Sequence, residues 1–308
     1  MTRIWVIGAN GLLGQSVSAA LSPDKRWDAP ERIHWNDERQ AVDQLRSTIK
    51  RFFNEVGSGS WNIFWCAGRG TVSGDTAEME RERGYLKVLL QEINGQPLTT
   101  QERGTFVFSS SAGAVYGGGD GGPYSELSTV NPFGPYGEHK VKCEEIIQKF
   151  SGTSPCRVAI CRISNLYGPN QDLSKGQGLI STLTVAMLKH KPAPIYVPLE
   201  TVRNFIYADD ASRIMVELSK AISVRESGTF IVKNVCAPHD LSIAMIVHEF
   251  TRVFGRRPPM VGRSPKVHAF SPRSLGVRSV VEQQIDEVPA TNLAIGISAI
   301  RRRVLLKL

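Results

Sequence analysis

The fold is decided by the stretch Ile4-Trp5-Val6-Ile7-Gly8-Ala9-Asn10-Gly11-Leu12-Leu13-Gly14, near the start of the chain. Residues 4–7 are a short apolar run typical of a buried strand, and apolar residues then recur at helical spacing from Leu13. Glycines between a strand and a helix let the backbone turn sharply and approach a pyrophosphate, which the free N–H groups of the helix attract. The spacing predicts a dinucleotide site formed by Gly8, Asn10, Gly11, Leu12, Leu13 and Gly14.

The rest of the chain alternates between strand-like and helix-like segments. Strands are predicted at residues 32–35, 61–66, 105–108, 156–162 and 229–235, and helices at 36–56, 75–93, 136–150 and 209–222. This alternation implies right-handed crossovers and a parallel sheet that is covered on both faces. We therefore expect an α/β protein with a Rossmann-type doubly wound parallel sheet and a smaller C-terminal α/β substrate lobe.

The rhythm changes after about residue 164, where Pro192, Pro194 and Pro198 interrupt the chain. We expect a dinucleotide-binding domain at residues 1–164, completed by about 203–235. The substrate-binding lobe is then expected at residues 165–202 and 236–308.

Composition narrows the classes of partner. The chain has 308 residues and a net charge of +8, which suits nucleic acid or a phosphate-bearing small molecule. The basic residues are dispersed, and we expect no nucleic-acid partner. No run approaches the roughly 18 apolar residues of a membrane span, so no membrane insertion is expected. The 5 cysteines are scattered and odd in number, which favours the cytoplasm over a disulfide framework, and the histidines make no ligand spacing, so we expect no metal.

The choice of dinucleotide stays open at this point. A carboxylate that binds the adenosine ribose should follow the second strand. Acidic candidates compete there with basic residues that suit a 2′-phosphate: Asp28, Glu31 and Asp37 against Lys25, Arg26 and Arg32. The cofactor is therefore expected to be NAD or NADP.

Tyr136 and Lys140 are four residues apart, so they project from one face of the predicted helix. A phenol is a poor base at neutral pH, but a neighbouring ammonium and an oxidised nicotinamide would stabilise its phenolate form. Ser111, after the 105–108 strand, could bond the same substrate oxygen, so the three form a predicted catalytic site for oxidising an alcohol or reducing a ketone. His139 is expected to face solvent, and Asp209-Asp210 to cap the helix that follows them.

Several motifs together resemble the extended short-chain dehydrogenase/reductase family, in its nucleotide-sugar epimerase/dehydratase branch. Besides the opening glycine loop they are Ser109-Ser110-Ser111-Ala112-Gly113-Ala114-Val115-Tyr116-Gly117, Pro135-Tyr136-Gly137-Glu138-His139-Lys140, Arg162-Ile163-Ser164-Asn165-Leu166-Tyr167-Gly168-Pro169-Asn170 and Arg203-Asn204-Phe205-Ile206-Tyr207-Ala208-Asp209-Asp210. In this order and at these intervals the motifs are specific for the family and much less so for the reaction.

The resemblance implies a role for each matching residue. Tyr136 would be the acid/base, Lys140 would bind the nicotinamide ribose, and Ser111 would orient the reacting hydroxyl, with Ser110 as a rival for that role. Asn165 and Arg203 would meet the diphosphate of a sugar nucleotide. The remaining predicted cofactor residues are Cys66, Ala67, Gly68 and Ser109, although a small buried filler is the simpler interpretation of Cys66.

The resemblance favours an epimerase that works on a nucleotide-activated sugar through a transient ketone. Members that eliminate water place Asp-Glu after the catalytic hydroxyl, whereas Ala112 and Gly113 here cannot move a proton. Two alternatives remain, an NADPH-dependent 4-ketoreductase of a nucleotide-linked deoxysugar and a non-catalytic dinucleotide sensor. Family members also form homodimers, so a homodimer is possible here.

Overall fold

Six parallel strands form the main sheet of the protein, in the order β2-β1-β3-β4-β5-β9. The computed structural model describes residues 1–68, 75–119, 121–173, 178–263 and 273–306. The strands of this sheet are β1 (Thr2–Ile7), β2 (Arg26–Trp27), β3 (Ser60–Trp65), β4 (Gly104–Ser111), β5 (Arg157–Ile163) and β9 (Phe230–Val235). The sheet confirms the expected Rossmann-type architecture.

Helices cover both faces of this sheet. One face packs against α2 (Glu38–Val56), α3 (Thr76–Asn94) and α6 (Gly134–Ser151), and the other against α1 (Leu12–Ala20) and α8 (Ala208–Ser223). The alternation along β4 shows how the sequence builds the two layers, because Phe106 and Phe108 join the first core and Val107 joins the second. All three are fully buried, as expected for a strand that is covered on both sides.

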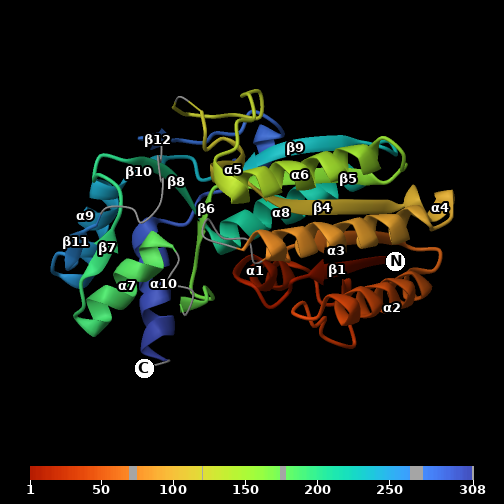
Figure 1. The fold of residues 1–308 in the computed structure, drawn as a ribbon, viewed down its shortest axis with the longest axis horizontal. Helices are drawn as coiled ribbons and strands as arrows, with labels where there is room; N and C mark the ends of the chain where they lie inside the picture. The colour runs from red at the N-terminus through yellow and green to blue at the C-terminus, as the bar shows by residue number, and fades with distance from the viewer. Residues whose placement is uncertain (69–74, 120, 174–177, 264–272, 307–308) are drawn as a thin grey trace.

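A second group of elements lies to the left of the main sheet in Figure 1. Here β8 (Val202–Tyr207) pairs with β6 (Asn165–Tyr167), β10 (Asp240–Ser242) and β12 (Ser274–Leu275), and β7 (Ala193–Ile195) pairs with β11 (Met260–Gly262). The helices α7 (Leu179–Lys189), α9 (Ile243–Phe254) and α10 (Leu293–Leu305) share a separate apolar core with these strands except β12, whose Leu275 belongs to another cluster. The short helices are α4 (Leu98–Gln101), α5 (Ala112–Val115) and the 3₁₀ turn η2 (Gln283–Ile285).

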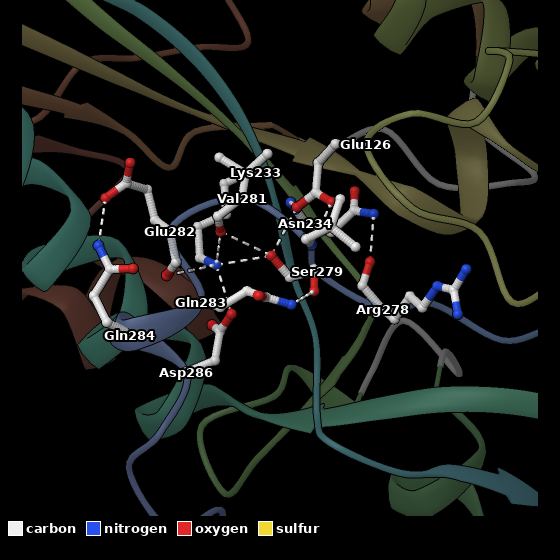
Figure 2. A network of polar contacts seen from close by, with 11 residues as sticks. Glu126, Lys233, Asn234, Arg278, Ser279, Val281, Glu282, Gln283, Gln284 and Asp286 are labelled. Atoms are coloured by element: carbon white, nitrogen blue, oxygen red, sulfur yellow. Dashed lines mark hydrogen bonds and ion pairs between the residues drawn. The ribbon is translucent and has the colours of Figure 1, made fainter.

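A polar network covers the outer edge of β9, the last strand of the main sheet (Figure 2). The fully buried ammonium of Lys233 donates to the Ser279 hydroxyl at 2.8 Å and to the Asp286 carboxylate at 2.7 Å. The backbone N–H of Asn234 donates to the Glu126 carboxylate at 2.7 Å, so this edge group has a partner as well. These hydrogen bonds and the ion pair hold residues 278–286 against β9.

The second strand does not lie where the sequence predicts it. Residues 32–35 form no strand, and β2 consists of Arg26 and Trp27 instead. Trp27 is buried and packs edge-on against Trp5 and Phe52 at ring-centroid distances of 5.5 and 5.1 Å. Burial of the Trp27 ring therefore decides which segment pairs with β1. The longer 32–35 segment contributes only partly buried side chains that pack against the core.

No helix in the described part of the chain is both long and apolar enough to cross a membrane.

Candidate active site

The glycine loop lies where the order of strands reverses. From β1 the chain goes to β2 on one side and then returns to β3 on the other, so the switch point of the sheet, where open α/β sheets bind ligands, lies at the carboxyl ends of β1 and β3. Gly8 has a φ of +87°, and a Cβ placed on it would lie 2.5 Å from the backbone nitrogen of Ala67. The first loop and the end of β3 therefore touch backbone to backbone, a contact that a side chain at position 8 would prevent.

The start of α1 fits a dinucleotide phosphate. Gly11 is the N-cap and supplies no side-chain cap, so the first N–H groups of the helix keep their capacity to bind an anion. A Cβ on Gly14 would lie 2.1 Å from the carbonyl oxygen of Gly8, so only glycine lets the helix sit this close to the loop. Asn10, Leu12 and Leu13 share this segment, and the predicted residues fit a bound pyrophosphate.

Cys66, Ala67 and Gly68 follow β3 and lie beside this loop. The N–H of Cys66 donates to the carbonyl of Ile7 at 2.8 Å, which extends the β1–β3 pairing to the sheet edge. Burial raises the pKa of the Cys66 thiol above its usual range, so the side chain is a neutral thiol. The backbone of Cys66 thus lies beside the end of β1, next to the glycine loop.

Tyr136 and Lys140 lie in the first turns of α6, and the structure brings them together. The Lys140 ammonium lies 5.9 Å from the Tyr136 ring centroid and 5.2 Å from that of Phe108 on β4. Helix α5, whose N-cap is Ser111, packs against α6. Ser111, Tyr136 and Lys140 therefore belong to one corner of the structure, at the carboxyl end of β4.

The three consecutive serines have different surroundings. Ser109 donates to the carbonyl of Trp65 on β3 at 2.8 Å. Ser110 is buried and donates to Glu144 Oε1 at 2.5 Å. Ser111 is partly exposed, and its hydroxyl has no hydrogen-bond partner among the described residues. The structure thus leaves Ser111 available for a ligand and engages Ser110 in the interior.

Lys140 is buried and forms an ion pair that the sequence did not suggest. Its Nζ lies 3.3 Å from Glu82 Oε1 on α3, with the two side chains 7% and 11% exposed. Burial alone would lower the pKa of Lys140, but the Glu82 carboxylate outweighs burial and raises it above the usual range. Burial would likewise raise the pKa of Glu82, yet Lys140 and then His139 hold it at about 2. Both groups are therefore charged at neutral pH.

The prediction of a solvent-facing His139 is wrong. Its side chain is 1% exposed, and its Nε2 lies 3.2 Å from Glu82 Oε1. Arg83 Nη1 lies 3.1 Å from His139 Nδ1, and because a guanidinium can only donate, Nδ1 accepts and Nε2 carries the proton that faces Glu82. His139 is buried because its turn of α6 packs against α3.

Asn165 and Arg203 lie together on the second sheet, away from the strands that carry the other predicted site residues. Asn165 on β6 pairs with Phe205 on β8, two residues after Arg203. The Asn165 amide donates to the carbonyl of Asn204 at 2.8 Å. Arg203 Nη1 donates to the carbonyl of Val202 at 2.7 Å, and burial lowers the pKa of the Arg203 guanidinium. A partly buried guanidinium remains charged and suits a diphosphate.

The acidic residues that are candidates for binding the adenosine ribose lie in different surroundings. Asp28 follows β2 directly and forms an ion pair of 3.1 Å with Arg26, whereas Asp37 accepts from the N–H of Gln40 as the N-cap of α2. The expectation that Asp209-Asp210 caps α8 is wrong, because Tyr207 is its N-cap. Asp209 accepts from the Ser16 hydroxyl and Asp210 from the N–H of Thr291, so both join helices and loops across the structure.

Two buried acidic residues of the site, Glu82 and Glu144, are not among the residues that the sequence predicts. The sequence nevertheless contains a pattern that indicates a buried position for each of them. Glu82 lies on the stripe of α3 that also carries Met79, Leu86 and Leu90, and Glu144 follows Lys140 by one turn of α6. A charged residue on an apolar stripe predicts a buried partner. No group of three or more His, Cys, Asp or Glu side chains able to hold a metal occurs in the described ranges.

Comparison with known proteins gives a family match for most of the chain. The model of the NAD dependent epimerase/dehydratase family matches residues 4–232. A protein of Methanocaldococcus jannaschii named "Putative UDP-glucose 4-epimerase" is 37% identical over 191 residues, which are 60% of this chain and 53% of that protein. The UDP-glucose 4-epimerase of Mycolicibacterium smegmatis is 30% identical over 104 residues, 34% of this chain and 33% of that one. The chain thus matches about half or less of the length of these relatives.

Solved structures share the fold over nearly the whole chain. MoeE5 in complex with UDP-glucuronic acid and NAD has a TM-score of 0.79 at 22% identity, covering 99% of this chain and 100% of that chain. The UDP-glucose 4-epimerase of Thermotoga maritima with UDP-glucose has a TM-score of 0.79 at 21% identity, covering 100% and 99%. At this identity the likeness establishes the fold.

Proposed function

The chain belongs to the NAD-dependent epimerase/dehydratase family, and on that premise we propose that it is an NAD-dependent 4-epimerase of a nucleotide-activated sugar. One observation carries the proposal. The Tyr136 ring and the Lys140 ammonium are 5.9 Å apart at the carboxyl edge of the sheet that also presents the glycine loop. The names of relatives that match this chain, from Methanocaldococcus jannaschii and Mycolicibacterium smegmatis, agree with this reaction.

Tyr136 is the proposed acid and base. Its phenolate oxygen accepts the proton of the sugar hydroxyl as the carbon that bears this hydroxyl is oxidised to a ketone. It returns the proton after the ketone has rotated in the site to present its other face. Lys140 stabilises the phenolate through its charge, and Ser111 donates a hydrogen bond to the reacting oxygen. Both the proton and the hydride that leave the sugar return to it in each cycle, so the sugar is isomerised without net oxidation.

The dinucleotide is proposed to lie across the ends of β1 and β3. Gly8, Asn10, Gly11, Leu12, Leu13 and Gly14 would hold its pyrophosphate, and Cys66, Ala67, Gly68, Ser109, Tyr136 and Lys140 its nicotinamide half. When bound, NAD would supply the hydride acceptor for the oxidation and, in its reduced form, the hydride donor for the reduction of the ketone. The first helix and its glycines carry this assignment, because their N–H groups suit a phosphate and Gly11 provides no side-chain cap that would compete for them.

The sugar nucleotide is proposed to bind between the two parts of the chain. Residues 1–164, with about 203–235, would bind the dinucleotide, and residues 165–202 and 236–308 the substrate, with Arg203 on β8 at the boundary between the two parts. Asn165 and Arg203 are the proposed diphosphate contacts, since they are neighbours on β6 and β8 and offer an amide and a guanidinium.

A 4-ketoreductase is the second candidate. One observation favours it, because the dTDP-4-dehydro-6-deoxyglucose reductase of Escherichia coli is 33% identical over 104 residues, 34% of this chain and 33% of that one. Water elimination is disfavoured, since Ala112 and Gly113 follow Ser111 and offer no proton-transfer group. A non-catalytic sensor would have no need of a buried ammonium beside a tyrosine.

Four measurements test this proposal. Purified protein is expected to release NAD on denaturation, detected by mass spectrometry, and to interconvert UDP-glucose and UDP-galactose without added cofactor. Loss of NADPH absorbance in proportion to a 4-keto sugar nucleotide would instead identify the reductase. Tyr136→Phe is expected to lower kcat by about a hundredfold to ten thousandfold while NAD binding persists. Firm NAD binding with no turnover of any sugar nucleotide would indicate the sensor.

We also propose a homodimer in a reducing compartment, the cytoplasm. The free thiols of all 5 cysteines support the compartment, and the family resemblance supports the dimer. Light scattering after size-exclusion chromatography measures the oligomeric state directly.

A further inference from the structure

We propose that Glu82 is a positioning residue for Lys140, whose ammonium it holds beside Tyr136 and keeps protonated. The inference deepens the proposed function, because it assigns the charge partner of the lysine in the Tyr136–Lys140 pair. It concerns how this chain's own residues are arranged, so it is testable without substrate and without a measurement of turnover.

The geometry places Glu82 between two parts of the site. Its Oε1 lies 3.3 Å from Lys140 Nζ and 3.2 Å from His139 Nε2, so two donors from α6 converge on one oxygen from α3. A Cβ placed on Gly68 would lie 2.9 Å from the same oxygen. The carboxylate thus reaches from the loop after β3 to the catalytic helix.

Contacts of Arg83 and His139 hold the Glu82 carboxylate in place. Arg83 donates to His139 Nδ1 at 3.1 Å, which leaves the Nε2 proton of His139 to face Glu82. Arg83 also lies 3.7 Å from the exposed Glu80, one turn earlier. The order Glu80, Arg83, His139, Glu82, Lys140 is a chain of polar contacts that begins at the surface and ends at the ammonium.

The ammonium needs this partner because it is buried. An amine without a counter-charge in such surroundings loses its proton far more readily, since burial disfavours the charged form. Within the described part of the chain, Glu82 is the one carboxylate at ion-pair distance from Lys140. Glu144, one turn along α6, is engaged by Arg162 at 2.6 Å and by Ser110. The titratable or charged groups around Lys140 are Glu82 and Arg83 from α3 and Tyr136, His139, Cys143 and Glu144 from α6; β4 contributes the Phe108 ring.

The test is a titration of Lys140 in Glu82→Gln. Protein labelled at the lysine ε-carbons with ¹³C reports each ammonium by NMR, and Lys140→Arg assigns the Lys140 signal. In Glu82→Gln the titration midpoint of Lys140 is expected to fall by at least about one pH unit, because burial then acts without the carboxylate. The alkaline limit of kcat should move to lower pH with it. Glu92→Gln is the matched control, since Glu92 lies on the same helix and pairs with Arg46 at 3.5 Å.

A folded Glu82→Gln protein whose Lys140 midpoint equals that of the wild type would overturn the proposal. If Glu82→Gln does not fold, Glu82→Gln/Lys140→Met decides, because removing the unpaired ammonium should restore folding. A double variant that folds as poorly as the single one also overturns it. The NMR midpoint is measured without turnover, so absence of epimerase activity would defeat the proposed function and leave this result standing.

Discussion

Ser110 on β4 and Glu144 on α6 are joined by a hydrogen bond of 2.5 Å from Oγ to Oε1, and both side chains are buried. Arg162 on β5 binds the same carboxylate, with its Nη2 2.6 Å from Oε2. The strand that ends at Ser111 is thereby tied to the helix that carries Tyr136. Because Ser110 is held in this contact and Ser111 is not, substitutions of the two serines are expected to have different effects.

Ser110→Ala is expected to affect stability and Ser111→Ala to affect turnover. Loss of the Ser110 hydroxyl removes a buried hydrogen bond to a carboxylate and should lower the free energy of unfolding by about 1 to 3 kcal/mol. Ser111→Ala should change stability by less than about 0.5 kcal/mol, because its hydroxyl has no partner in the described structure. It should lower kcat by about a hundredfold. Urea unfolding and initial rates measure both, and the reverse pattern would make Ser110 the substrate contact.

Gly14→Ala is expected to weaken dinucleotide binding more than tenfold, as measured by titration calorimetry with NAD. The added methyl would lie 2.1 Å from the carbonyl oxygen of Gly8, so the loop must move away from the start of α1. Gly84→Ala is the matched control, since its Cβ would meet no atom within 4 Å inside α3. That change should stabilise the helix by up to about 1 kcal/mol. A folded Gly14→Ala protein with wild-type affinity for NAD would remove this loop from the cofactor site.

The sequence predicts much of the fold because its signals are local. A glycine loop between a strand and a helix, and apolar strands 61–66 and 156–162, each carry their own evidence, and the structure has β3 and β5 within about one residue of these bounds. The two-residue strand β2 is different. Its place depends on Trp27 packing against Trp5 and Phe52, a tertiary contact that no local pattern contains.

The site is less predictable than the fold because it also depends on tertiary contacts that no local pattern contains. Tyr136 and Lys140 are visible as a pair at helical spacing, but the partner of Lys140 comes from Glu82, 58 positions earlier. His139 was wrongly expected at the surface because spacing within α6 shows which residues share a face and not what covers each face. Only the packing of α3 on α6 supplies that information.

Lys233→Met is expected to lower the free energy of unfolding by about 2 to 4 kcal/mol, because it leaves the Asp286 carboxylate without its buried cation. The double variant Lys233→Met/Asp286→Asn should recover part of this loss, since neither charge then remains. Arg252→Met is a control on an exposed ion pair, with Glu249 at 2.8 Å, and should cost less than about 1 kcal/mol. Equal losses in the two single variants would show that the network in Figure 2 adds no more stability than an exposed ion pair.

The stability that Glu82 contributes is expected to disappear in acid. Burial would raise the pKa of Glu82, but Lys140 and His139 hold it at about 2 in the folded protein, against 4.5 for an ordinary glutamate. A carboxyl whose pKa is lowered by folding stabilises the protein above its unfolded pKa, and this contribution is lost as pH falls from about 4.5 towards about 2. The difference corresponds to about 3 kcal/mol. Urea unfolding of the wild type and Glu82→Gln at pH 7, 5, 4 and 3 should give a gap that is constant between pH 7 and 5 and narrows below about 4.5. Glu92→Gln should stay close to the wild type throughout, and a Glu82→Gln gap that is undiminished at pH 3 would show that the carboxylate is not held ionised by Lys140.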